Sequence, residues 1–216
     1  MALASASIAR PLRGNPVFFR GAERFTTRVL KSPPIAKRVR PSTRLNESPA
    51  VPAAIVAAEP ADIARVQHLA QEIWNRHYPG IITAEQIDYM LAQAYSHEAL
   101  MRYLAEPGAG LALARRGELA VGFVGWYKAD AHVMKLDKLY VLPQHHGEGI
   151  GRALIEHVVA RARGASCAAV SLNVNRRNTL AVAAYERCGF AIRERGDFPI
   201  GNGFVMEDFI MVRDLV

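Results

Sequence analysis

Three glycines, Gly147, Gly149 and Gly151, follow the apolar residues 139–142 and precede a segment with helical spacing. The first N–H groups of a helix have no intrahelical partner and lie at the positive end of the helix dipole, so they can bind an anion. Glycine has no side chain and lets such an anion come close to the backbone. The junction is therefore predicted to bind a pyrophosphate group.

Two common glycine loops do not fit this spacing. A P-loop ends in Lys followed by Ser or Thr, whereas Arg152 and Ala153 follow the glycines here. A dinucleotide-binding fingerprint has a glycine three residues after its second one, and Arg152 stands three residues after Gly149. The spacing excludes both kinds of loop.

A second group of residues that could take part in binding or catalysis follows at 171–190. It comprises Asn173, Asn175 and Asn178, then Ala181 and Tyr185, then Cys188-Gly189-Phe190. The two cysteines of the chain, Cys167 and Cys188, are too few for a disulfide framework, and we expect them to be buried, inert thiols in a reducing compartment. The seven histidines are dispersed, so no metal site is predicted.

Together the two segments resemble the GCN5-related N-acetyltransferases, the GNAT superfamily. The acyl-CoA signature of that family has Arg or Gln, then Gly three residues later, and then Gly or Ala two residues after that glycine. His146, Gly149 and Gly151 stand at these positions, and His146 departs from the usual Arg or Gln. The second segment resembles the family's N-x-x-N strand end, A-x-x-x-Y helix and closing G-F. The resemblance covers roughly residues 53 to 216.

The resemblance implies that acetyl-CoA is the acyl donor and coenzyme A a product. The backbone of Leu139, Tyr140 and Val141 would pair with the pantetheine arm in a gap between strands. The pyrophosphate would be held by His146, Gly147, Glu148, Gly149, Ile150, Gly151 and Arg152. Asn178 would bind the pantetheine or phosphate region, or cap the following helix, or both.

Tyr185 matches the residue that protonates the leaving thiolate in the family, although it could instead be a packing tyrosine. Many relatives carry a basic Glu where this chain has Asn173, which cannot take a proton but could orient a water molecule. Candidates for the general base are Asp137 and His77, with Asp208 as a weaker one. Asp137 could equally be an ion-pair partner of Lys135 or Lys138.

The acceptor is predicted to be a primary amine, preferably a small one such as a polyamine. Trp74, His77 and Tyr78 would form one wall of its site and hold it by cation–π contact, or else they pack as a helix end on the sheet. Residues 202–208 would form the opposite wall. Alternatives are a protein N-terminal or lysine acetyltransferase, and a non-catalytic acyl-CoA-binding module.

The order of predicted elements gives an α/β fold. Strands are expected at 53–58, 110–114, 119–127, 132–142, 168–174, 190–195 and 204–212, and helices at 62–78, 83–96, 97–104, 149–163 and 179–187. Thr83 and Gln86 have the spacing of a capping box. The resemblance implies a GNAT-type mixed, mostly antiparallel central sheet, flanked by helices and splayed between the fourth and fifth strands.

Residues 1–50 differ from the rest in charge. They hold ten basic and two acidic residues, which leaves seventeen basic and eighteen acidic residues for the domain at 51–216. We expect a disordered leader outside the fold, either an organellar transit peptide or a start-site extension. The protein is accordingly expected in the cytoplasm, or in a plastid or mitochondrion if the leader is a transit peptide.

The charge distribution also bears on partners. The domain carries almost no net charge, so no nucleic acid is expected as its partner, although the leader alone could bind one. No apolar run reaches the roughly 20 residues that cross a bilayer, so no membrane partner is expected. Relatives are often dimers, which makes a homodimer one expectation.

Overall fold

The computed structural model describes residues 5–6 and 53–215. The strands are β1 Ser5–Ala6, β2 Ala54–Ala57, β3 Gly110–Arg116, β4 Leu119–Lys128, β5 Val133–Val141, β6 Ala169–Asn175, β7 Ala191–Gly201 and β8 Phe204–Asp214. The α-helices are α1 Ile63–His77, α2 Ala84–Ala94, α3 His97–Ala105, α4 Ile150–Gly164 and α5 Thr179–Arg187, and single 3-10 turns occupy η1 Pro60–Asp62 and η2 Pro143–His145.

The sheet has the strand order β2-β3-β4-β5-β6-β8-β7, and every pair is antiparallel except β5 with β6. That parallel pair holds only over Val133–Lys135 and Ala169–Ser171, after which the two strands part. The mixed, mostly antiparallel sheet with a splay between these two strands is the predicted fold. Beyond Lys135 this edge of β5 does not pair with β6, and Leu139 and Lys138 pair with Ser5–Ala6 instead.

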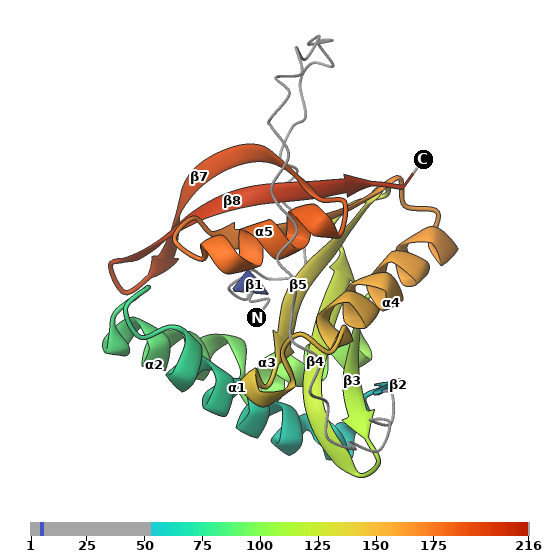
Figure 1. Ribbon diagram of the computed structural model, residues 1–216, viewed down its shortest axis with the longest axis horizontal. Coiled ribbons are helices and arrows are strands. Elements are labelled where there is room, and N and C mark those ends of the chain that lie inside the picture. Colours follow the sequence, from blue (N-terminus) through green and yellow to red (C-terminus); the bar gives the residue numbers. More distant parts are fainter. Residues whose placement is uncertain (1–4, 7–52, 216) are drawn as a thin grey trace, which may run out of the picture. The chain divides into compact units, whose positions relative to one another are not determined.

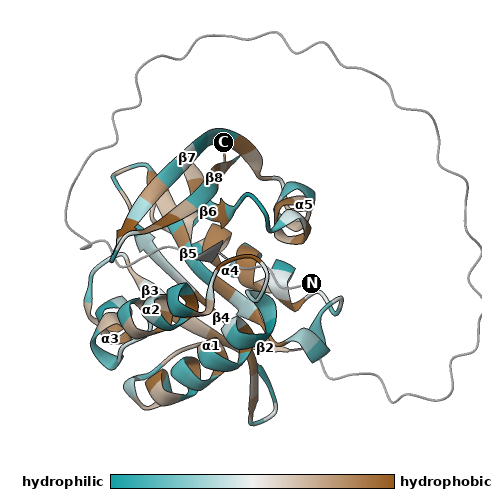
Figure 2. Cartoon of the chain, turned by 90° about the vertical axis from the view of Figure 1, so that its left-hand side faces the viewer, coloured by the Kyte–Doolittle hydropathy of each residue, from teal (hydrophilic) through white to brown (hydrophobic). Residues whose placement is uncertain are grey.

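The helices cover the two faces of the sheet (Figure 1). Helices α1, α2 and α3 pack on one face around Val66, Trp74 and Phe123, and α4 and α5 pack on the other around Val158, Leu172 and Tyr185. Each helix has a polar and an apolar side, visible as teal and brown stripes in Figure 2. The splay between β5 and β6 lies between these two cores.

The starts of α2 and α3 follow from their sequences. Thr83 accepts a hydrogen bond from the backbone N–H of Gln86 at 3.2 Å, and Ser96 accepts one from Ala99 at 3.1 Å. The capping box expected at α2 is only half formed. The amide of Gln86 reaches the carbonyl oxygen of Val205 at 3.3 Å instead of returning to the Thr83 backbone.

A β-bulge in β5 decides which side chains face which layer. Gly125 pairs with Lys138 and Trp126 with Leu136, so Asp137 is an extra residue opposite β4. Leu136 and Leu139 consequently both join the core beneath α4. Asp137 and Lys138 both turn towards α3, where they contact Tyr103.

One expectation about strands was wrong. Strand β7 continues to Gly201 instead of ending near residue 195, because Gly196 and Pro199 are tolerated in this edge strand. Of the leader, Ser5–Ala6 pairs with Leu139 and Lys138 of β5. The other residues of the leader lie outside the described part of the chain.

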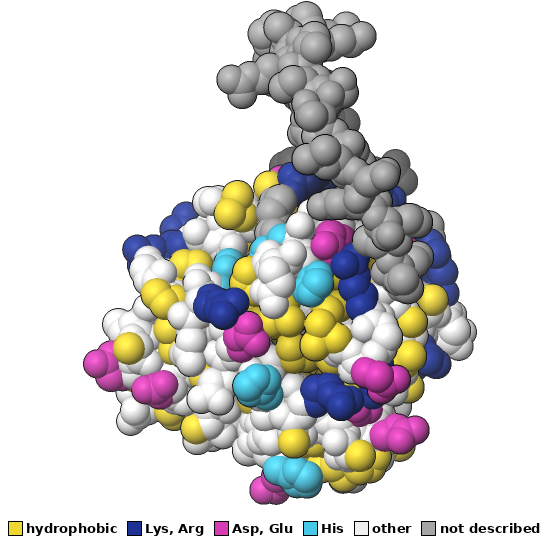
Figure 3. All heavy atoms as spheres, turned by 60° about the horizontal axis from the view of Figure 1, so that its bottom comes forward, with side chains coloured by type: hydrophobic (Ala, Val, Ile, Leu, Met, Phe, Trp, Pro, Cys, Tyr) yellow, Lys and Arg dark blue, Asp and Glu magenta, His cyan; other side chains and the backbone are white. Residues whose placement is uncertain are grey.

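Among the described residues, no helix is long and apolar enough to cross a membrane. On the face drawn in Figure 3, basic and acidic side chains are interspersed and no block of a single charge forms. This pattern agrees with the near balance of basic and acidic residues counted after residue 50.

Candidate active site

The glycine turn uses backbone conformations that other residues adopt only with strain. Gly147 has φ of +85° and Gly149, the N-cap of α4, has φ of +82°. A Cβ atom at either position would meet nothing within 4 Å, so the space in front of both is open. No side chain caps α4, which leaves its first N–H groups available to an anion.

A cavity of about 270 Å³ lies against this turn, between the end of β5, the start of α4 and the end of α5. Seven of the residues predicted to bind the cofactor's pyrophosphate or pantetheine line it, namely Val141, His146, Gly147, Gly149, Ile150, Gly151 and Arg152, together with His145, Ala184, Arg187 and Cys188. The structure therefore gathers most of the predicted anion site into one hollow.

Arg187 belongs to this cavity and was not predicted. Ala184, Arg187 and Cys188 lie three and four residues apart on α5, so a common helix face was readable from the sequence. Burial raises the pKa of the Cys188 thiol, and Arg152 and Arg187 are close enough to act against that rise. Two guanidinium groups thus flank the hollow and suit a dianionic ligand.

Glu148 was predicted in the same site, but its side chain is engaged elsewhere. Its carboxylate lies 2.7 Å from the guanidinium of Arg116 and 3.3 Å from Nδ1 of His145. It is not among the residues that line the cavity. Only the backbone of Glu148 is therefore placed to contact a bound pyrophosphate.

His146 stands where relatives have Arg or Gln, and it acts here as a hydrogen-bond donor. Its Nε2 lies 2.7 Å from the carbonyl oxygen of Val141, which can only accept. Burial lowers the pKa of His146, so the ring is neutral at neutral pH. It fixes the end of β5 without adding a positive charge to the anion site.

Leu139 and Tyr140 are completely buried, and their side chains lie in the cores on opposite faces of the sheet. Their backbones lie on the stretch of β5 that does not pair with β6. The pairing of Ser5–Ala6 with Leu139 and Lys138 demonstrates that an extended chain fits against this stretch. A pantetheine arm with its two amides has the same hydrogen-bonding needs.

Asn178 joins the two sides of the splay. Its Oδ1 caps α5 by accepting from Ala181 N at 3.3 Å, and its Nδ2 donates to Nε2 of His77 at 2.9 Å. Burial, followed by the proximity of His146, lowers the pKa of His77 and keeps Nε2 unprotonated. Asn178 thus serves as the predicted cap, and His77 connects the end of α1 to it.

Tyr185 lies on the face of α5 that packs on the sheet, with its ring edge-on to Phe190 at 5.7 Å. It is fully buried, and its hydroxyl has no hydrogen-bond partner among the described residues. Burial, with a smaller effect from Tyr78, raises its pKa well above the usual value. The hydroxyl is therefore protonated and has an unused donor.

Asp137 is placed differently from what a general base requires. It is buried, it accepts hydrogen bonds from Lys138 Nζ at 2.9 Å and from the hydroxyl of Tyr103, and Lys138 also lies over the rings of Tyr95 and Tyr103. The structure has the ion pair with Lys138 that was the alternative interpretation. Its Oδ2 is thus occupied by a buried cation and a tyrosine hydroxyl.

Asn173 lies between two ionisable side chains on neighbouring strands. Its Oδ1 accepts a hydrogen bond from Lys135 Nζ, and its Nδ2 donates to Asp208 Oδ2 at 3.4 Å. Lys135 comes from β5, Asn173 from β6 and Asp208 from β8. The sequence offered Asn173 and Asp208 separately, and the sheet brings them together.

The aromatic residues after α1 lie in the core. Trp74 and Tyr78 are 0% and 1% exposed, with ring centroids 4.3 Å apart, and the Trp74 N–H donates to the Tyr95 hydroxyl at 3.3 Å. The Tyr140 hydroxyl interacts with Tyr78 and Tyr95. Trp74 and Tyr78 thus have the packing role that was the alternative to an acceptor wall, while His77 is half-buried.

Comparison with known proteins gives the same family as the sequence resemblance. Residues 66–190 match the family model described as the Acetyltransferase (GNAT) family. An uncharacterized N-acetyltransferase of Mycobacterium tuberculosis is 32% identical over 138 residues, which cover 64% of this chain and 88% of that protein. Spermidine N(1)-acetyltransferase of Thermoplasma acidophilum is 25% identical over 150 residues, covering 68% and 90%.

Solved structures show the same fold. The PaiA N-acetyltransferase of Thermoplasma acidophilum, in complex with coenzyme A, superimposes with a TM-score of 0.66 at 23% identity, covering 76% of this chain and 99% of that one. A GCN5-related N-acetyltransferase from Rhodopseudomonas palustris gives 0.65 at 18% identity, covering 79% and 100%. The chain therefore belongs to the GNAT family and is an N-acetyltransferase.

Proposed function

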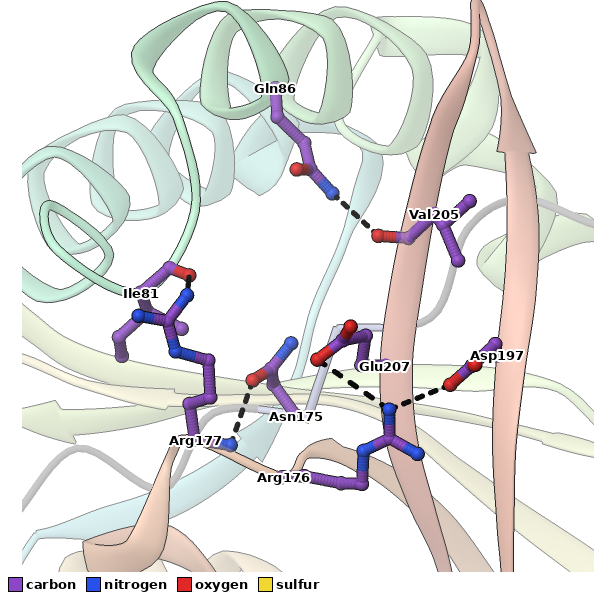
Figure 4. Close-up of polar contacts among 8 residues, drawn as sticks. All are labelled: Ile81, Gln86, Asn175, Arg176, Arg177, Asp197, Val205 and Glu207. Carbon is purple, nitrogen blue, oxygen red and sulfur yellow. Dashed lines mark hydrogen bonds and ion pairs between the residues drawn. The ribbon is translucent and has the colours of Figure 1, made fainter.

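We propose that this enzyme acetylates a small primary amine, with a polyamine as the preferred class of acceptor. The observation that carries the proposal is a set of hydrogen bonds that tie α2 to the β7–β8 hairpin. Tyr89 donates its hydroxyl to the carbonyl oxygen of Ile200 at 2.9 Å, and Gln86 donates to that of Val205 at 3.3 Å (Figure 4). The Tyr89 and Phe204 rings pack 5.4 Å apart beside them.

A second set of contacts joins the chain after β6 to the segment between α1 and α2 and to the β7–β8 hairpin. Arg177, which follows β6, donates to the carbonyl oxygen of Ile81 in the segment between α1 and α2 at 3.1 Å (Figure 4). Arg176 beside it pairs with Asp197 of the hairpin at 2.7 Å. An extended peptide needs an open groove with free backbone partners, whereas these bonds restrict the approach to a compact ligand.

The side of the sheet enclosed by these contacts also carries a charge that suits an ammonium group. The carboxylate of Asp208, which is buried on the side of the sheet covered by α1 and α2, supplies negative charge. The spermidine acetyltransferase of Thermoplasma acidophilum, similar to this chain over most of its length, acts on an acceptor of this class and supports the same choice.

The roles of the cofactor-side residues follow from their positions. The N–H groups at the start of α4, with Arg152 and Arg187, bind the pyrophosphate, and the pantetheine arm pairs with the edge of β5 in place of Ser5–Ala6. This path directs the thioester towards α5, where Tyr185 holds a buried hydroxyl with an unused donor. Tyr185 donates its proton to the thiolate that leaves as the amide bond forms.

The proposal is tested by acceptor competition with the full chain. Spermidine, a lysine-containing peptide and a peptide with a free N-terminus are offered singly with acetyl-CoA, and release of free thiol is measured. We expect kcat/KM for spermidine to exceed that for either peptide at least 10-fold. A preference for a peptide contradicts the proposal, and binding of acetyl-CoA without transfer to any amine identifies a non-catalytic module.

A further inference from the structure

The fold alone does not explain why the carboxylate of Asp208 is buried. Asp208 is 2% exposed, and its Oδ1 has no hydrogen-bond partner among the described residues. Its Oδ2 receives a single long bond of 3.4 Å from Asn173. A buried carboxylate oxygen without a donor is costly, and the cost is explained if a ligand supplies the missing partner.

The side of the sheet on which Asp208 lies is the acceptor side. Met206, two residues earlier on β8, belongs to the core under α1 and α2 and contacts the amide of Gln86. Side chains two apart on a strand share a face, so Asp208 also points towards these helices. Asp208 thus lies behind the boundary formed by α2 and the β7–β8 hairpin.

Tyr78 is coupled electrostatically to Asp208 and to Tyr185. The charge of Asp208 contributes to the raised pKa of Tyr78, and Tyr78 in turn contributes to that of Tyr185. Tyr78 lies in the core under α1 and α2, on the side of the sheet that Asp208 faces.

Asp137, the other buried carboxylate on this side, also has an Oδ1 without a partner among the described residues, but its Oδ2 is bound by a cation. Lys138 and Tyr103 both donate to its Oδ2, and Lys138 lies next to it in the sequence and is 1% exposed. Among the described residues Asp208 has no direct cation partner, because Lys135 bonds to the amide of Asn173 and not to the carboxylate. Of the two, Asp208 is therefore the carboxylate that no described cation contacts directly.

We propose that Asp208 is the base that removes the proton from the acceptor amine, and that Asn173 is the positioning residue that aims its carboxylate. This inference rests on the proposed transfer of acetyl to an amine. The amine nitrogen bonds to the thioester carbon and its proton passes to Asp208, while the C–S bond breaks and the thiolate takes the proton of Tyr185. Solvent then returns the proton from Asp208 to the tyrosinate, which leaves an amide and a thiol.

The charged groups around Asp208 suit this task. Burial raises its pKa to about 7, against the opposing effects of the Asn173 hydrogen bond, Lys135 and Arg176. Burial likewise lowers the pKa of Lys135 to about 8, although Asp137 and Asp208 act against it. Tyr78 faces the group from the end of α1. A base with a pKa near the working pH is both ionised and basic enough to accept a proton.

The test is the pH dependence of kcat/KM for spermidine with the full chain and saturating acetyl-CoA. Asp208→Asn is expected to lose about 100-fold in kcat/KM, to lose the acidic limb near pH 7, and to bind acetyl-CoA as tightly as the unchanged protein. Asn173→Ala and Lys135→Gln each remove an effect that lowers the pKa of Asp208, so both are expected to move that limb to higher pH.

Asp214→Asn is the matched control, since Asp214 is exposed on the same strand and pairs only with exposed Arg193 among the described residues. Activity of Asp208→Asn within 3-fold of the unchanged protein, with the limb retained, overturns the proposal. If no amine is acetylated, the proposed acceptor fails separately, and Asp208 is tested on hydrolysis of acetyl-CoA, where water loses the proton. A 10-fold loss of hydrolysis in Asp208→Asn then supports its role, and no loss, or no hydrolysis by the unchanged protein, overturns it.

Discussion

The imidazole of His77 accepts a hydrogen bond from Nδ2 of Asn178 at 2.9 Å, which joins the last residue of α1 to the N-cap of α5. These helices lie on opposite faces of the sheet, on either side of the splay in which we propose that the cofactor binds. The two side chains therefore set the spacing of the site as well as contributing to the fold.

The contribution of this hydrogen bond to the free energy of unfolding can be separated from that of the helix cap. In Asn178→Ser the hydroxyl still caps α5 but cannot reach His77, so we expect the free energy of unfolding to fall by about 1 kcal/mol. Asn178→Ala loses the cap as well and is expected to lose about 1 kcal/mol more. Urea unfolding measures both, and Ser96→Ala, which removes only the cap of α3, is the control. A serine variant as stable as the unchanged protein would show that the bond contributes nothing.

The same bond predicts a pH dependence. Burial and the nearby His146 lower the pKa of His77 in the folded protein below its ordinary value of 6.5. Between the two values the unfolded chain binds a proton that the folded one does not, so this stabilisation is complete above pH 6.5 and is lost as the pH falls. We expect the difference in Tm between pH 7.5 and pH 5 to be smaller in His77→Gln than in the unchanged protein. An equal difference in both proteins contradicts this account.

Asp208 is expected to change stability with pH in the opposite direction, so that its contribution becomes less favourable as the pH rises. Its pKa is about 7 in the folded protein against 3.8 as the ordinary value, so between these values the folded state binds the extra proton. Its unfavourable contribution therefore grows as the pH rises from about 4 to 7 and is largest above 7. We expect Asp208→Asn to raise Tm more at pH 8 than at pH 5, as measured by thermal unfolding. A larger gain at pH 5 would contradict the burial of an ionised carboxylate.

Tyr185→Phe removes a hydroxyl that has no partner among the described residues, and leaves the ring packed on Phe190. We expect the variant to be at least as stable as the unchanged protein, because no hydrogen bond is lost. Its kcat is expected to fall about 100-fold while its affinity for acetyl-CoA stays the same. Thiol release and calorimetry separate the two effects, and a lower affinity with an unchanged kcat would assign Tyr185 to binding.

The local parts of this site were predictable from the sequence. Glycine positions, the apolar strand before them and the capping residues Thr83 and Asn178 each act within a few neighbours along the chain, so spacing identifies them. Arg187 was missed, although its spacing from Ala184 and Cys188 would have placed it on the same face of α5. These features depend on local backbone geometry alone.

The acceptor side depends on relations that spacing does not encode. Strand β8 lies between β6 and β7, and this order brings Asp208 beside Asn173, 35 residues away along the chain. The bulge at Asp137 turns that residue and Lys138 to the same face, where strict alternation would have separated them. The sequence therefore favoured Asp137 over Asp208 as the base, whereas in the sheet Asp208 is the carboxylate without a direct cation partner among the described residues.

The central claim is that acetyl-CoA binds where β5 runs into α4, and calorimetric titration of the full chain tests it most directly. Gly149→Val puts a branched side chain at φ of +82° in front of the open N–H groups, so we expect affinity to fall at least 10-fold. Gly164→Ala, at a position of the same helix without positive φ, is the control and should bind normally. Equal affinity for acetyl-CoA in Gly149→Val and the unchanged protein would contradict the account.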